Sequence, residues 1–159
     1  MAPFDTAPAL ADQQAPVDFV LGIKGRAVYS VAPHTSVLDA ITTLAHHDIG
    51  ALLVMEGQRL VGVFSERDYT RNVVLKGRTS RDSRVRDVIS DQLVTVTLGT
   101  SVAECMRLMT DWRIRHLPVM DFDRVVGIVS IGDLVSFVMR SQHDTISHLR
   151  SYIAGHYPA

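Results

Sequence analysis

The sequence is poor in cysteine and has no long hydrophobic run. Cys105 is the only cysteine among 159 residues, so the chain has no internal disulfide and no cluster of thiolates for a metal. No apolar stretch approaches the roughly 20 residues that a helix needs to cross a bilayer. The start of the sequence lacks the basic and then apolar segments of a secretory signal. We therefore expect a cytoplasmic protein.

An excess of charge of one sign is also absent. The 16 basic and 17 acidic residues leave a net charge of −1 with neutral histidines. Such a chain has no overall field that attracts nucleic acid or an acidic membrane, so neither is expected as a partner. Glycine-rich phosphate loops are missing, and no set of side chains indicates a nucleophile with its base. We therefore expect neither an enzyme nor a metal site.

What the sequence does contain is a tandem repeat with an offset of 65 residues. Residues 35–68 align with 100–133 without a gap, and twelve of the 34 positions are identical. Average composition alone would give about two identities. The identical positions in the first copy are Thr35, Ser36, Val37, Ile49, Leu52, Val54, Met55, Arg59, Val61, Gly62, Ser65 and Asp68.

The periodicity of each copy predicts a β-α-β-β-α unit, so the fold class is α/β. The two units are expected to pack about a pseudo-twofold axis, because each would be marginal alone. The boundaries are a loose N-terminal tail (1–17), repeat one (18–83), repeat two (84–141), and a C-terminal helix and tail (142–159). The expected strands are 27–31, 51–55, 60–64, 93–97, 116–120 and 125–129, and the expected helices are one or two turns at 17–23, and 35–47, 65–75, 87–89, 101–112, 130–142 and 145–154.

Each copy ends a strand with Ser-x-x-Asp, at Ser65 and Asp68 and again at Ser130 and Asp133. This pattern has two readings. A Ser at the N-cap and an acid three residues later form a capping box, which is a purely structural feature. A short acid beside the N-terminus of a helix is also suited to the hydroxyls of a ribose, with a phosphate nearby.

The repeated strand with Gly-h-h-Ser-x-x-Asp (h, hydrophobic), together with Ile114-x-x-Leu117-Pro118-Val119, resembles the CBS domain. The resemblance covers about residues 18–141 and implies a stand-alone CBS pair. CBS pairs bind adenine nucleotides such as AMP, ADP, ATP or a dinucleotide such as NAD in clefts between the repeats. The resemblance also implies a homodimer. A structural and dimerisation module with vestigial clefts, acting through protein partners, is the alternative.

Carried over residue by residue, the resemblance implies two sites that each draw on both repeats. Repeat two would enclose the base of one nucleotide, whose sugar and phosphate would lie on repeat one. Site A would consist of Ser65, Arg67, Asp68, Arg71, Leu93, Val94, Ile114, Arg115, His116 and Pro118, and site B of Lys24, Tyr29, Ile49, Gly50, Ala51, Ile128, Ser130 and Asp133. The copies differ at Glu66-Arg67 against Ile131-Gly132, so the two sites are not expected to be equivalent.

Overall fold

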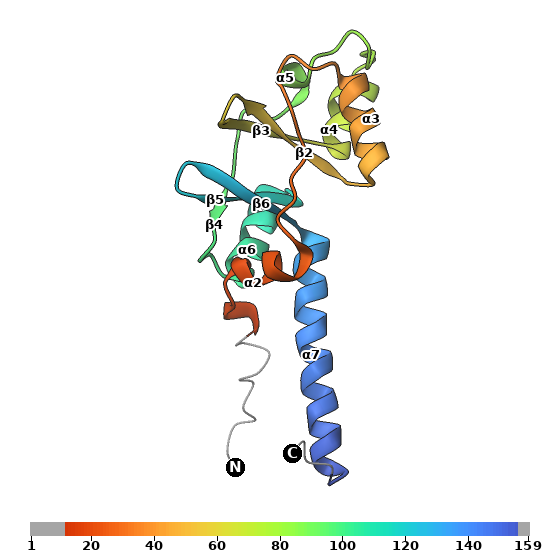
Figure 1. Cartoon of the computed structure of the whole chain (residues 1–159). Helices are drawn as coiled ribbons and strands as arrows, with labels where there is room; N and C mark the ends of the chain where they lie inside the picture. Colours follow the sequence, from red (N-terminus) through yellow and green to blue (C-terminus); the bar gives the residue numbers. More distant parts are fainter. Residues whose placement is uncertain (1–11, 156–159) are drawn as a thin grey trace. The chain divides into compact units, whose positions relative to one another are not determined.

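The fold is mixed α/β, as expected, and the computed structural model describes residues 12–155 (Figure 1). Two three-stranded sheets have the orders β1-β2-β3 and β4-β5-β6. The chain divides into two units. Unit 1 comprises the described parts of Met1–Gly25 and Ile128–Ala159 together with Val96–Leu117, and unit 2 comprises Arg26–Thr95 and Pro118–Gly127.

The first repeat forms β1, α3, β2, β3, α4 and a single π-helical turn, η1. Strand β1 is parallel to β2, which is antiparallel to β3, so that Ala51 lies opposite Ser65. The Ser36 hydroxyl caps α3 by accepting a hydrogen bond from the Asp39 N–H (3.1 Å). The bounds are Ser30–Val31 (β1), Val37–His47 (α3), Ala51–Glu56 (β2), Arg59–Ser65 (β3), Glu66–Tyr69 (α4) and Thr70–Val74 (η1).

The second repeat follows the first at the same offset. Its elements are β4 (Val96–Thr97), α6 (Val102–Trp112), β5 (His116–Asp121), β6 (Arg124–Ser130) and α7 (Ile131–Ile153). Helix α6 and strands β5 and β6 lie 65 residues after α3, β2 and β3, and Ser101 caps α6 as Ser36 caps α3. The tandem β-α-β-β-α architecture predicted from the sequence is confirmed.

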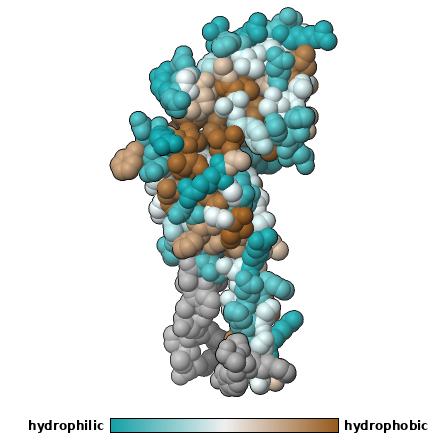
Figure 2. Space-filling view, viewed as in Figure 1, coloured by the Kyte–Doolittle hydropathy of each residue, from teal (hydrophilic) through white to brown (hydrophobic). Residues whose placement is uncertain are grey.

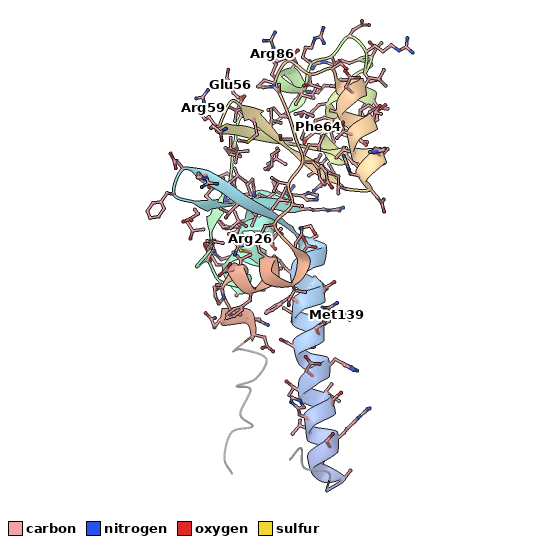
Figure 3. The ribbon with its side chains drawn as sticks, in the orientation of Figure 1. Arg26, Glu56, Arg59, Phe64, Arg86 and Met139 are labelled. Atoms are coloured by element: carbon pink, nitrogen blue, oxygen red, sulfur yellow. The ribbon has the colours of Figure 1, made fainter. Side chains whose placement is uncertain are left out.

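The core of unit 2 lies between its sheet and helix α3. Phe64, labelled in Figure 3, is fully buried and is the largest side chain there. The Ile89 side chain lies so close to Gly62 that an added Cβ would approach its Cδ1 to 2.7 Å, so a larger residue here would require Ile89 to move. The buried residues of this core are Val37, Ala40, Leu44, Leu52, Val54, Phe64, Val73, Val85 and Val88.

A short helix packs on each repeat in the same way. In unit 1, α2 (Val17–Lys24) donates from the Val17 N–H to the Thr100 carbonyl (2.7 Å), and the Val102 N–H donates to the Ala15 carbonyl (2.9 Å). In unit 2, α5 (Val85–Val88) makes the matching bonds: Val85 N–H to Thr35 O (3.0 Å), and Val37 N–H to Ser83 O (2.9 Å). Helix α2, which precedes repeat one, thus completes repeat two, and α5, which follows the strands and helices of repeat one, completes repeat one.

The N-terminal tail is therefore shorter than predicted. Ala15 and Pro16 pair with Ser101 and Val102 at the start of α6, and Val17, the first residue of α2, is fully buried. The rest of the tail prediction, residues 1–11, lies outside the described residues, as do residues 156–159.

Several other predicted elements differ in extent from the observed ones. The C-terminal helices 130–142 and 145–154 form one continuous helix, α7, since no Pro or Gly separates them and the Thr145 hydroxyl bonds to the Ser141 carbonyl (3.0 Å). The helix at 65–75 changes at Thr70 into the wider η1 turn. The strands at 27–31 and 93–97 shrink to the two-residue strands β1 and β4, and the short helix at 87–89 begins earlier, at Val85.

Within residues 12–155, none of the helices is both long enough and apolar enough to cross a bilayer.

Candidate functional site

The corner between β3 and α4 holds Ser65 and Asp68 in a reciprocal capping box. The Ser65 N–H and hydroxyl both donate to Asp68 Oδ2, at 2.8 and 2.9 Å, and the Asp68 N–H donates to Ser65 Oγ at 3.3 Å. The Glu66 N–H donates to the Gly50 carbonyl (3.2 Å). The structural reading of Ser-x-x-Asp is therefore realised, although Asp68 Oδ1 takes part in none of these bonds.

The corner between β6 and α7 repeats this geometry and adds a cation. The Ser130 N–H donates to Asp133 Oδ2 (2.8 Å), and the Asp133 N–H donates to Ser130 Oγ (3.1 Å). Lys24, the last residue of α2, reaches the same corner. Its ammonium donates to Asp133 Oδ2 (2.6 Å) and to the Ile128 carbonyl (2.8 Å).

The pKa values of the two carboxyls shift in opposite directions. Burial raises the pKa of Asp68, and the hydrogen bonds from Ser65 and the charges of Arg67 and Arg71 oppose this only in part. Burial also raises the pKa of Asp133, but here the hydrogen bond from Lys24 and those from Ser130 outweigh it, so the pKa lies below its ordinary value.

His116 belongs to the same electrostatic neighbourhood as Lys24 and Asp133. Burial lowers the pKa of His116, and the positive charge of Lys24 lowers it further, against the opposing effect of Asp133. The imidazole is therefore held in its neutral form at physiological pH, in which one ring nitrogen can accept a hydrogen bond.

A pocket of about 200 Å³ opens beside Asp133, between α2 and the first turns of α7. Its walls combine apolar side chains with two cationic ones, so it suits a ligand that has both apolar and anionic parts. Its lining residues are Val20, Ile23, Lys24, Asp133, Ser136, Phe137 and Arg140.

Five of these residues were not predicted from the sequence. Ser136, Phe137 and Arg140 follow Asp133 at three, four and seven residues, so they share its face of α7. That spacing was visible in the sequence. Val20 and Ile23 line the pocket because α2 packs on this unit, and the sequence gives no local signal for that packing.

The predicted residues of site A fall in both units. In unit 2, Ser65 and Asp68 meet directly, and the charges of Arg67 and Arg71 act on Asp68. Leu93 is exposed, Val94 is half-buried and Pro118 is buried in the same unit. Ile114, Arg115 and His116 belong to unit 1. Their meeting with Asp68 stays a prediction.

The predicted residues of site B divide in the same manner. The structure brings Lys24, Ile128, Ser130 and Asp133 together in unit 1. Ile49, Gly50 and Ala51 lie at the start of β2 in unit 2. Tyr29, also in unit 2, stacks on His47 with ring centroids 3.8 Å apart. A nucleotide contact for these four residues stays a prediction.

Comparison with protein families gives a match at both repeats. The family model described as CBS domain matches residues 23–75 and 85–140. The mitochondrial CBS domain-containing protein CBSX3 of Arabidopsis thaliana is 41% identical over 127 residues, which is 77% of this chain and 62% of that protein. The chain therefore spans less than two thirds of the plant relative's length.

A bacterial relative and a solved structure give the same picture. The CBS domain-containing protein YhcV of Bacillus subtilis is 33% identical over 107 residues, covering 67% of this chain and 76% of that protein. A Burkholderia ambifaria structure, described as that of a candidate signal-transduction protein with CBS domains, is 42% identical. It superposes with a TM-score of 0.77 and covers 80% of this chain and 96% of that one.

Proposed function

Because the chain belongs to the CBS-domain family, with its repeats at residues 23–75 and 85–140, we propose that it is a regulatory module that binds an adenine nucleotide. The ligand would be AMP or a relative such as ADP, ATP or NAD. The module would act without catalysis, as a cytoplasmic homodimer. A bound nucleotide would alter its conformation only as far as it binds one state more tightly than another.

The pocket beside Asp133 is the observation that carries this proposal. Lys24 and Arg140 supply positive charge for a phosphate, and Phe137 and Ile23 supply an apolar wall. Its volume of about 200 Å³ is below the roughly 300 Å³ at which ligand pockets usually begin. The pocket would therefore hold the sugar and phosphate, and the base would lie outside it.

The Asp133 carboxylate can take part in ribose binding without losing its cap. Its described hydrogen bonds all fall on Oδ2, and a diol needs acceptors on one side of the carboxylate only. Lys24 would then either stay on Asp133 or move to the phosphate. In unit 2, the charges of Arg67 and Arg71 act on Asp68, so we expect a second site whose affinity differs from that of the site at Asp133.

Calorimetric titration of the full chain with AMP, ADP, ATP and NAD tests the proposal. We expect saturable binding to the wild type, and at least about 10-fold weaker binding to one site in Asp133→Asn, because charge-assisted hydrogen bonds to the sugar are lost. Asp68→Asn should affect the other site. Asp123→Asn, on the exposed β5–β6 turn, is the matched control. Wild-type protein that gives no heat with any of the four would refute the proposal.

A structural and dimerisation module acting through protein partners is the second candidate. The observation that favours it is the capping box, in which both aspartates already serve their own backbone. This candidate predicts that Asp68→Asn and Asp133→Asn lower the thermal unfolding temperature but that nucleotides leave it unchanged. A nucleotide-dependent rise in that temperature for the wild type would decide against it.

A further inference from the structure

Helix α7 continues well past the part of unit 1 on which it packs. Its first turns contribute Leu134 to the core and line the pocket beside Asp133. From Ile146 to Ile153, every residue whose burial is described is exposed. Figure 1 shows this half of α7 extending away from the other described elements of unit 1. We call residues 139–153 the arm.

The exposed apolar residues of α7 lie in one line that begins just before the arm and runs along it. Val135, Met139, Ile146, Leu149 and Ile153 are 41%, 64%, 49%, 56% and 83% exposed. With Gln142, they are spaced by four, three, four, three and four residues, which is the a/d pattern of a two-stranded coiled coil. The arm stripe is the set Val135, Met139, Gln142, Ile146, Leu149 and Ile153.

The opposite side of the arm is polar. Asp144, Ser147 and Ser151 are exposed there, and the face of the arm visible in Figure 2 is mainly hydrophilic. A solitary helix of about 15 residues is marginal in water, since most helical stability in proteins comes from packing an apolar face. The arm is therefore amphipathic, as expected of a helix whose apolar face packs against another apolar surface.

We propose that a second copy of this chain covers the arm stripe, and that the two arms form a short parallel coiled coil. A stripe with heptad spacing is complementary to itself about a twofold axis, so the chain carries its own partner surface. A parallel pairing sets Gln142 opposite its counterpart, where the two amides bond to each other. An antiparallel pairing would set Gln142 against Ile153 and leave both amides unpaired in an apolar seam.

The charges beside the stripe are compatible with this pairing. In a parallel coil, residues at g positions face residues at e positions of the other helix. Thr145 then faces Arg150, and Val138 faces His143, so no like charges meet. Two heptads bury less than the roughly 800 Å² per partner of a standard interface. The contact is therefore reversible.

Sedimentation equilibrium of the full chain over a series of concentrations tests the proposal. The double variant Ile146→Glu/Leu149→Glu places charges in the seam and should weaken self-association at least about 10-fold. The control Ser147→Glu/Ser151→Glu adds the same charge on the outward face and should associate like the wild type. Equal association constants for both variants, or a wild type that stays monomeric throughout, would overturn the proposal.

Disulfide trapping gives a second readout of register. Cys105 is buried, so we expect the wild type to form almost no covalent dimer under mild oxidation. Leu149→Cys lies at a d position, and in a parallel coil its sulfur meets its own counterpart. We expect the covalent dimer of Leu149→Cys to form at least about 10-fold faster than that of the outward Ser147→Cys. Equal rates for the two variants would exclude the parallel coil.

Discussion

Asp68 and Asp133 occupy equivalent corners of the two repeats, yet their pKa values shift in opposite directions. Both cap a helix through the preceding Ser, at nearly the same distances. Only Asp133 receives a lysine. Identical motifs in one chain therefore have different electrostatics, because a residue outside the repeat decides them.

The cause lies in the length of the short helix that packs on each repeat. Helix α2 runs for eight residues and carries Lys24 at its end, whereas α5 runs for four and ends at Val88. When Val17 is matched with Val85, Gln92 takes the position of Lys24. There the chain has already left the helix, since Ile89 is extended. One additional helical turn thus brings the ammonium to Asp133.

The largest difference that we expect mutation to reveal between the two repeats lies in their cores. Phe64 and Val129 are equivalent positions, and both are fully buried. Phe64→Ala should lower the free energy of unfolding by about 3–5 kcal/mol. Val129→Ala should lower it by about 1.6 kcal/mol, because only two methylene equivalents are lost. Urea denaturation measures both, and equal losses would mean that the repeats fill their cores alike.

The next contrast lies in the hairpin turns. Gly57 (φ 64°) and Phe122 (φ 54°) are equivalent left-handed positions, and the Phe122 side chain is 96% exposed. A β-carbon costs roughly 1–2 kcal/mol in this conformation. Phe122→Gly should therefore raise the free energy of unfolding by about 1 kcal/mol, and Gly57→Phe should lower it by a similar amount.

The control for the hairpin prediction is Phe122→Ala. It removes the exposed ring but keeps the β-carbon, so it should give little of the gain. If Phe122→Ala stabilises as much as Phe122→Gly, the effect comes from the ring and not from the backbone.

The smallest of the three effects is electrostatic. Asp133 has a lowered pKa, so it contributes stability above the ordinary carboxyl pKa of 3.8, and this is lost as the pH falls through the lower folded value. Lys24→Met should raise the pKa of Asp133 and make it resemble Asp68. NMR titration of the Asp133 carboxyl measures the shift directly.

Lys76→Met, on an exposed loop, is the matched control for the removal of a lysine. It should leave the titration of Asp133 unchanged. If Lys24→Met also leaves it unchanged, then the ion pair is not what separates the two aspartates, and the difference must come from their burial and their other hydrogen bonds.

Much of the fold could be predicted because its signals are local. The caps at Ser36 and Ser101, and the buried run at Leu52–Val54, lie within a few residues of the elements that they define. The single helix α7 was missed because polar residues at 142–145 imitate a break. The η1 turn was missed because it depends on tertiary contacts such as that of Asn72 Nδ2 with the Val88 carbonyl (2.7 Å).

The candidate site was less accessible from the sequence. Ser-x-x-Asp was visible, and the family resemblance set Lys24 against Asp133, although 109 residues separate them. The pocket residue Arg140 could have been found from its helical spacing to Asp133. The opposite pKa shifts of Asp68 and Asp133 could not have been predicted, because they depend on where α2 ends relative to Asp133, a residue far along the chain.

The completion of unit 1 by α2 has a consequence for synthesis. Helix α2 leaves the ribosome well before its partners around Thr100 and Val102, which lie about 80 residues later in the chain. At about 5–20 residues per second, Val17, Val20 and Leu21 wait several seconds without the surface that covers them. During that time the nascent chain exposes these apolar side chains, and a ribosome-associated chaperone would bind them.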